Sequence, residues 1–174
     1  MRRSASVLVG VVLLLLGFGV AGIWSANADA ATRSSLNPLA RAIDDASRAK
    51  KPFRDLTATR VALGRHVMNV VVADDADERT AGLRQRRDIG PYDGMVFAFD
   101  GPTSTGFTMS TVPVALDIGF YDAAGRVVDR LRMEPCAGSE AECPVYRASG
   151  PFVYALETLA DALPRGRLRA RPPG

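Results

Sequence analysis

The feature that most constrains the fold is an alternating stretch, FTMSTVPVALDIGFYD, which runs from Phe107 to Asp122. Its even positions carry apolar side chains: Val112, Val114, Leu116, Ile118 and Phe120. A period of two is typical of a β-strand, so these side chains are expected to face a hydrophobic core. Because Pro113 can interrupt a strand, the alternation holds from Val114 onward.

The opposite face of this strand carries one acid, Asp117. Its neighbours on that face are small: Thr111, Pro113, Ala115 and Gly119. Two interpretations stay open. A floor of small residues with one carboxylate suits a shallow binding groove, whereas a carboxylate in a strand also commonly pairs with an arginine or accepts bonds from backbone N–H groups.

Other short runs predict further strands. They are TRVALGRHVMNVVVA, folded back at Gly64-Arg65, then GMVFAFD from Gly94, Arg126 to Met133 after a turn at Gly125, and FVYAL. Asp75 and Glu78 have the spacing of a capping box, which predicts a helix ending near Arg87. That helix would place Arg79, Leu83 and Arg86 on one face. A second short helix is predicted in LETLADALPRG, stopped at Pro164.

Many short strands with one capped helix among them indicate an α+β fold, here a small antiparallel β-barrel-like domain with one or two short helices. We assign this domain to residues 57–174, a length sufficient to bury a core.

The chain begins with an export signal. Arg2 and Arg3 precede an uncharged apolar run from Val7 to Trp24, about the minimum length for crossing a bilayer. Residues 1–28 are therefore predicted to be a membrane anchor or a signal peptide. Retention gives a single-pass protein of the cell membrane with its domain outside the cytoplasm, and cleavage gives a secreted protein. Residues 29–56 are predicted to form a stalk that contains a short helix beginning near Pro38.

A location outside the cytoplasm would allow the two cysteines to form a disulfide. Cys136 and Cys143 flank the loop CAGSEAEC, and a disulfide there would stabilise the fold by about 2.5 kcal/mol in the chain-entropy model. The spacing fits no zinc pattern and His66 is the one histidine of the chain. We therefore expect no metal and no cofactor.

The basic residues are almost all arginines, and they are scattered rather than gathered with aromatic residues. With a formal charge of +3, this distribution argues against a nucleic-acid partner. The last segment, RGRLRARPPG, is locally basic. We interpret it as a solvated edge, with contact to phosphate or anionic lipid as the alternative.

Several ordered motifs resemble a known family. ADDADERTAGLRQR, GMVFAF, FTMSTVPVALDIGFYDAAGRVV, a cysteine loop and YALE make the chain similar to domain-of-unknown-function family 192 from about Ala58 to Arg167. The resemblance implies a small β-barrel-like α+β fold and no particular reaction. The matching positions are Arg79, Gly82, Leu83, Arg86, Gly94, Met95, Phe97, Met109, Thr111, Pro113, Leu116, Asp117 and Glu157.

The chain departs from the family pattern near its C-terminal edge. Ser110 stands where the family commonly has Asn, Ala160 stands where it has Gly, and Gly166-Arg167 replaces a Gly-Asp strand. These departures leave the match at that edge in question.

The favoured hypothesis is a non-catalytic module tethered to the membrane or secreted. It would bind a small ligand, an envelope glycan or an envelope protein in a groove with Asp117, Met109 and Thr111, and with Arg79 and Arg86 nearby. The alternative is a hydrolase or lyase with Asp117 as general acid or base and Arg79 or Arg86 holding an anionic substrate. A third hypothesis is a domain that only stabilises a larger envelope assembly.

The enzyme hypothesis lacks an evident partner residue, so no catalytic residue is assigned. Glycosidase chemistry usually needs two carboxyl groups about 5 to 9 Å apart, for which Asp129, Glu134 and Glu157 are candidates beside Asp117. An arginine-paired Asp117 would argue against this chemistry.

Overall fold

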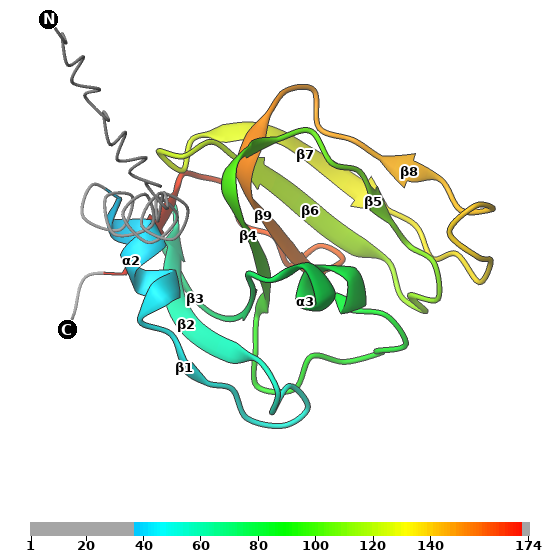
Figure 1. Ribbon diagram of the computed structural model, residues 1–174, viewed down its shortest axis with the longest axis horizontal. Coiled ribbons are helices and arrows are strands. Elements are labelled where there is room, and N and C mark those ends of the chain that lie inside the picture. Colours follow the sequence, from blue (N-terminus) through cyan, green and yellow to red (C-terminus); the bar gives the residue numbers. More distant parts are fainter. Residues whose placement is uncertain (1–36, 172–174) are drawn as a thin grey trace, which may run out of the picture.

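The computed structural model describes residues 37–171, which are organised around one mixed β-sheet (Figure 1). The strands follow the order β1-β2-β3-β4-β9-β6-β7, with β10 also paired to β2. In chain order the elements are α2 (Pro38–Asp44), β1 (Ser47–Arg48), β2 (Thr57–Leu63), β3 (His66–Ala73), α3 (Ala76–Ala81), β4 (Gly94–Thr103), β5 (Phe107–Thr108), β6 (Leu116–Tyr121), β7 (Val127–Met133), β8 (Val145–Tyr146), β9 (Phe152–Leu159) and β10 (Leu168–Ala170). The short strands β5 and β8 form a second, two-stranded sheet.

The α+β class is confirmed, but the barrel-like, wholly antiparallel sheet is not. In residues 37–171 the sheet is open, because β7 pairs with β6 alone while β1 and β10 pair with β2 at the other end. One pair, β3 and β4, is parallel. A parallel neighbour requires a crossover between the strands, and the segment that contains α3 supplies it.

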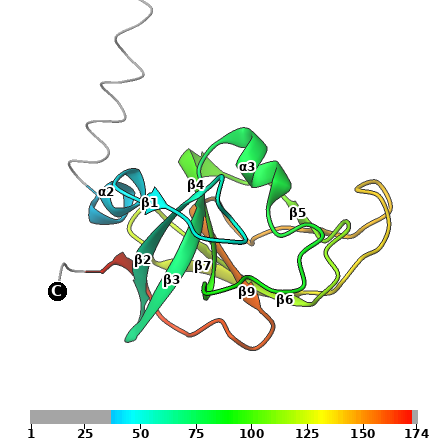
Figure 2. The same cartoon turned by 90° about the horizontal axis from the view of Figure 1, so that it is seen from below.

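Both faces of the sheet are buried. The inner cluster includes Met95, Phe97, Ile118, Phe120 and Phe152. The outer cluster includes Leu39, Ile43, Val70, Val96 and Leu168. Figure 2 shows α3 on one side of the sheet and the segment after β9 on the other.

The alternation in β6 is confirmed by these clusters. Leu116, Ile118 and Phe120 belong to the inner cluster, whereas Tyr121 belongs to the outer one. The predicted single strand is nevertheless split into β5 and β6. Thr111 has a positive φ of 60° and Pro113 follows it, so the chain leaves the extended conformation between the two strands.

The predicted capping box of α3 is present, but its predicted end is wrong. Asp75 caps the helix and Glu78 bonds back to the cap, yet the helix ends at Ala81 rather than near Arg87. Gly82 takes a φ of 45° and Gln85 a φ of 59°, which are values that an α-helix cannot contain. Leu83 and Arg86 therefore lie beyond the helix and do not share a helical face with Arg79.

The predicted C-terminal helix is also wrong. Residues Phe152–Leu159 form β9, which pairs with β4 on one side and β6 on the other. Pairing with two neighbours outweighs the helix propensity of the Leu and Glu residues at the start of LETLADAL. The chain then turns at Asp161, where φ is 65°.

The predicted short helix near Pro38 is present as α2, capped by the Asn37 side chain. Leu39 and Ile43 pack into the outer cluster, and Phe53 into the inner one. The predicted anchor or signal segment, residues 1–28, lies outside the described residues. Within residues 37–171 no helix has the length and hydropathy needed to span a membrane.

The turn between β6 and β7 provides a test of this packing. Gly125 has a φ of 72°, and a Cβ on it would collide with the carbonyl oxygen of Leu168 in β10. We expect Gly125→Ala to lower the free energy of unfolding by about 2 to 4 kcal/mol, since strain and collision add. Urea unfolding measures this loss. Gly101→Ala is the matched control, because a Cβ there meets nothing within 4 Å, and an equal loss in both variants would contradict the packing.

Candidate functional site

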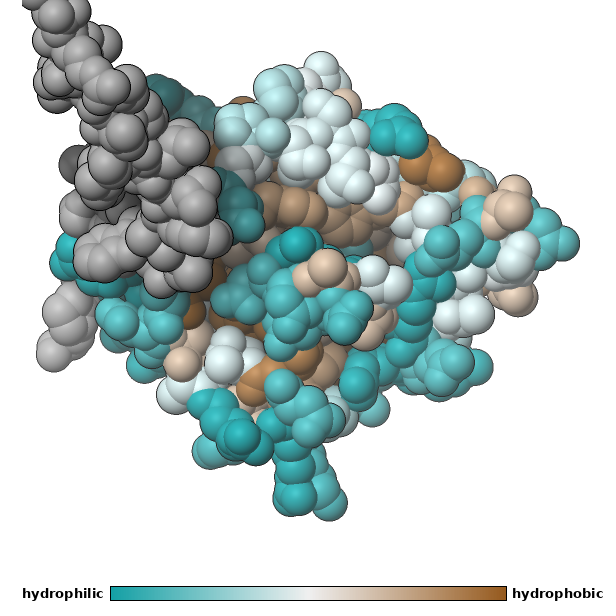
Figure 3. Space-filling model, in the orientation of Figure 1, coloured by the Kyte–Doolittle hydropathy of each residue, from teal (hydrophilic) through white to brown (hydrophobic). Residues whose placement is uncertain are grey.

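A pocket of about 470 Å³ opens on the inner face of the sheet between α3, β4 and β5, and we call it the Glu157 pocket. In Figure 3 an apolar hollow lies beside α3, between hydrophilic and near-neutral surfaces. The lining residues are Ala76, Arg79, Thr80, Ala81, Gly82, Leu83, Arg84, Phe97, Phe99, Thr103, Thr105, Gly106, Phe107, Thr108, Val112, Glu140 and Glu157.

Strand register places Glu157 in this pocket. In β9, Glu157 pairs with Met95 of β4 and with Ile118 of β6. Paired residues on neighbouring strands point to the same face, and both partners belong to the inner cluster. Glu157 thus occupies a core position that its neighbours on both sides fill with apolar side chains.

The Glu157 carboxyl group is buried without a partner. Its exposed fraction is 5%, and it makes no hydrogen bond or ion pair within residues 37–171. Burial raises its pKa from 4.5 to about 8. At neutral pH the group is therefore mostly a neutral acid that can donate one hydrogen bond.

Aromatic rings form the walls above this acid. Phe97 and Phe107 meet edge to face, with their ring centroids 5.2 Å apart. Phe107 also contacts Phe120 and Phe152, which fixes β5 over the inner cluster. The pocket therefore has aromatic walls close to the buried Glu157 carboxyl group.

Two arginines line the mouth of the pocket, and both are held in place. Arg79 donates to the carbonyl oxygens of Asp74 and Ala98, and its guanidinium lies 4.9 Å from the centre of the Phe99 ring. Arg84 pairs with Glu140 and donates to the Ser110 carbonyl oxygen. Because their guanidinium groups already donate to these acceptors, the two arginines form a polar rim at the mouth.

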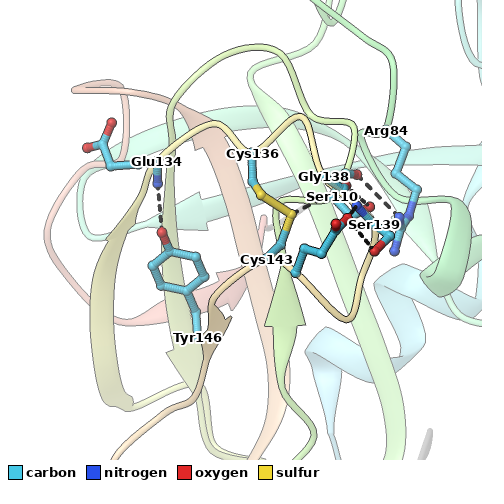
Figure 4. Close-up of a disulfide and its surroundings, with 9 residues drawn as sticks. Arg84, Ser110, Glu134, Cys136, Gly138, Ser139, Cys143 and Tyr146 are labelled. Carbon is cyan, nitrogen blue, oxygen red and sulfur yellow. Dashed lines mark hydrogen bonds between the residues drawn. A yellow bond between two sulfur atoms is a disulfide. The ribbon is translucent and has the colours of Figure 1, made fainter.

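The predicted disulfide is present and shapes one side of the mouth. The Cys136 and Cys143 sulfur atoms lie at disulfide distance, 1.99 Å. Figure 4 shows Ser110 and Arg84 facing the loop that these cysteines close. The Ser110 hydroxyl donates to the Gly138 carbonyl oxygen, and the same loop carries Glu140 to its pair with Arg84.

Asp117 lies on the other face of the sheet from the pocket. It pairs with Thr158, the neighbour of Glu157, so the two carboxyl groups point in opposite directions. Arg132 Nε donates to Asp117 Oδ1 over 2.6 Å, and the Asp161 N–H donates to Oδ2 over 2.7 Å. Arg132 also bonds Asp161, so Asp117 anchors the turn that follows β9.

The other predicted site residues are spread out. Met109 is buried in the inner cluster, and Thr111 is exposed in the segment between β5 and β6. Arg86 stacks over Phe53, with 4.3 Å from its guanidinium carbon to the ring centre. Of the predicted set, Arg79 alone lines the Glu157 pocket, and the structure does not bring Asp117 together with Arg79 or Arg86.

No metal site accompanies this pocket in the described part of the chain. Within residues 37–171, no three or more His, Cys, Asp and Glu side chains are placed to hold an ion.

The chain matches one family model, DUF192, described as "Uncharacterized ACR", over residues 58–170. The chain belongs to this family. The resemblance expected from the motifs is thereby confirmed, and both α3 and the Glu157 pocket lie inside the matched DUF192 region.

Two solved structures are similar to this DUF192 chain. A Novosphingobium aromaticivorans protein of unknown function is 24% identical, with a TM-score of 0.58 over 73% of this chain and 95% of its own. A Sinorhizobium meliloti protein described as a "putative transcription regulator" is 25% identical, with a TM-score of 0.52 over 63% of this chain and 88% of its own. No curated protein matches the chain.

The role of Asp117 can be tested by Asp117→Asn. We expect this variant to lose about 1 to 2 kcal/mol of unfolding free energy in urea, because its charge-assisted hydrogen bonds to Arg132 and Asp161 weaken. Asp55→Asn should lose nothing, because Asp55 is exposed and its side chain makes no hydrogen bond or ion pair within residues 37–171. Unchanged stability of Asp117→Asn would mean that the ion pair does not hold the turn after β9.

Proposed function

We propose that this DUF192 domain is a non-catalytic module that binds a small uncharged molecule in the Glu157 pocket. The observation that carries the proposal is the Glu157 carboxyl group, 5% exposed and without a partner at the base of an open pocket. The proposed binding site therefore lies on the inner face, rather than in a groove around Asp117.

Stability alone gives no reason for an acid at this position. A buried polar group without a hydrogen bond costs about 1 to 3 kcal/mol. Met95 and Ile118, its neighbours in register, show that an apolar side chain suits the site. A group that costs stability and lies in a pocket is typical of a functional residue.

The lining indicates the chemistry of the ligand. Phe97 and Phe107 offer apolar contact, Thr105 and Thr108 lie around the opening, and Glu157 offers one O–H at the base. This combination suits a neutral molecule with one apolar face and several hydrogen-bonding groups, as in the ring of a sugar. The volume of about 470 Å³ falls in the usual range for small-molecule sites.

The setting of this activity follows the sequence prediction. The domain would act outside the cytoplasm, tethered by residues 1–28 or secreted, where its ligand could be an envelope glycan or a group carried by an envelope protein. The Cys136–Cys143 bond supports this location, since disulfides persist in oxidising compartments.

Acid–base chemistry at Asp117 receives less support. Its carboxylate accepts from Arg132 and from the Asp161 backbone, and Glu157 points to the opposite face. A pair of cooperating carboxyl groups would have to share one face.

The raised pKa of Glu157 predicts a specific pH dependence. The unfolded chain loses this proton near pH 4.5 and the folded chain near pH 8, so between these values the folded state holds one proton more. Stability from this group is complete below pH 4.5 and is lost as the pH rises to 8. Glu157→Gln removes this dependence. Relative to wild type, the variant should gain about 4 kcal/mol of unfolding free energy between pH 5 and pH 9.

Urea unfolding at the two pH values measures this gain. Glu134→Gln is the control, because Glu134 is exposed and its side chain makes no hydrogen bond or ion pair in the described part of the chain. If Glu157→Gln follows the wild-type pH dependence, the carboxyl group is not held neutral by burial, and the proposed hydrogen-bond donor is lost.

Binding itself is tested by saturation-transfer NMR of the full chain with a panel of neutral mono- and disaccharides. We expect at least one to bind wild type and none to bind Thr80→Trp, because Thr80 is exposed and lines the mouth. Asp77→Trp, on the same helix but outside the lining, should bind as wild type does. Binding that survives Thr80→Trp, or a panel without any ligand, would overturn the proposal of a neutral ligand in this pocket.

A further inference from the structure

A second hollow, of about 590 Å³, lies at the edge of the sheet beside β2, and we call it the basic hollow. It is formed where the two partners of that edge meet. β10 pairs with Val61–Leu63 and β1 pairs with Thr57–Ala58, which leaves Thr59 and Arg60 between them without a strand partner on this side. The interruption of edge pairing brings the C-terminal segment next to β1.

Four cationic side chains line the basic hollow: Arg48, Lys50, Arg60 and Arg171. One carboxylate, Asp45, lines it with them. Within residues 37–171, none of the four cations makes an ion pair or a side-chain hydrogen bond. Their charges are thus available to a ligand.

Arginines elsewhere in the domain are used differently. Arg79 and Arg84 are engaged at the Glu157 pocket, and Arg130 donates to the carbonyl oxygens of Leu163 and Pro164. Structural roles therefore account for these side chains but not for those of the basic hollow.

The positive surface continues beyond the hollow. A shallower depression shares Arg48 and Lys50 with it and adds Lys51 and Arg54. Both lysines of the chain lie here. Figure 3 shows strongly hydrophilic side chains at the bottom of the view, where Figure 1 places the loop after β1.

We propose that the basic hollow binds the phosphate groups of an anionic membrane surface. Arginine and lysine bind phosphate through charge and several N–H donors, and a basic residue near such a surface contributes about 1 kcal/mol. Ser47, Thr59 and Asn69 add polar groups to the lining. The locally basic C-terminal segment thereby gains a function through Arg171.

The chain's own predicted membrane segment is the reason to propose lipid headgroups as the source of the phosphate. This choice rests on the predicted span from Val7 to Trp24. The twelve residues from Ser25 to Leu36 can reach at most about 42 Å, and they lead directly to α2. Ala42 of α2 and the C-cap residue Asp45 line the basic hollow, so the seven-residue helix α2 alone separates the hollow from the end of the tether at Asn37.

Docking here would orient the domain on the bilayer. The Glu157 pocket shares no lining residue with the basic hollow, so both can be occupied together. The two proposals are independent, and either can fail without the other.

Amide hydrogen exchange of the full chain tests the proposal, with nanodiscs of phosphatidylcholine alone or with about a third phosphatidylglycerol. We expect amides of residues 47–60 to exchange at least about fivefold more slowly when phosphatidylglycerol is present. The effect should disappear at about 0.5 M salt, which screens the charges. Because both nanodiscs offer the same apolar core, insertion of an N-terminal segment does not contribute to the difference.

The test variant is Arg48→Gln/Arg60→Gln, which should lose the slowing by phosphatidylglycerol while keeping its thermal midpoint. Arg65→Gln/Arg165→Gln removes the same charge from exposed residues at the other end of β2 and should keep the slowing. Equal loss in both double variants would mean a non-specific charge effect and would overturn the proposal.

A parallel titration with inorganic pyrophosphate distinguishes the source of phosphate. Slowing of residues 47–60 by pyrophosphate but not by phosphatidylglycerol would overturn membrane docking in favour of a soluble phosphate ligand. No slowing by either probe would overturn the site altogether.

Discussion

The pairing of β9 with β4 on one side and β6 on the other is the constraint on which the rest of the structure depends. It buries every residue from Phe152 to Thr158. Because successive side chains alternate between the faces, β9 supplies both clusters, with Ala155 on the inner side and Leu156 on the outer. The same pairing carries Glu157 into the inner core, where its exposed fraction is 5%.

Asp117 and Glu157 show how strand parity gives two acids different surroundings. Asp117 and Glu157 belong to adjacent strands and differ by one step in register. That step turns Asp117 toward a partly exposed surface, where Arg132 and the Asp161 backbone satisfy it. It turns Glu157 toward the inner face and the Glu157 pocket, where burial raises the pKa of its carboxyl group to about 8. Chemically similar groups thus acquire different roles from the pleat of the sheet.

The sequence predicted the elements that depend on local patterns. The period of two in β6, the glycine turns at Gly64 and Gly125, the capping box at Asp75 and the cysteine pair are all properties of nearby residues. It could not predict the end of α3, because the φ of Gly82 and Gln85 depends on contacts outside the helix. Nor could it predict that the FVYAL strand continues to Leu159, because the partners of that strand lie far along the chain. The family motifs pointed to Glu157, but its isolation appears only when Met95 and Ile118 are seen beside it.

The irregularities of the sheet coincide with both proposed sites. The break between β5 and β6 lets Phe107 pack over the inner cluster. It also leaves the space of the Glu157 pocket, which an unbroken strand would have filled. In the gap between β1 and β10, Arg60 has no strand paired beside it on this edge. It lines the basic hollow together with the other cationic side chains. Regular strand pairing satisfies the backbone N–H and C=O groups and leaves little space between strands. In a small domain, space for a ligand is therefore expected where strand pairing stops. The open sheet is therefore a condition for the binding proposed at the basic hollow, since closure into a barrel would have joined the edge strands and removed that hollow.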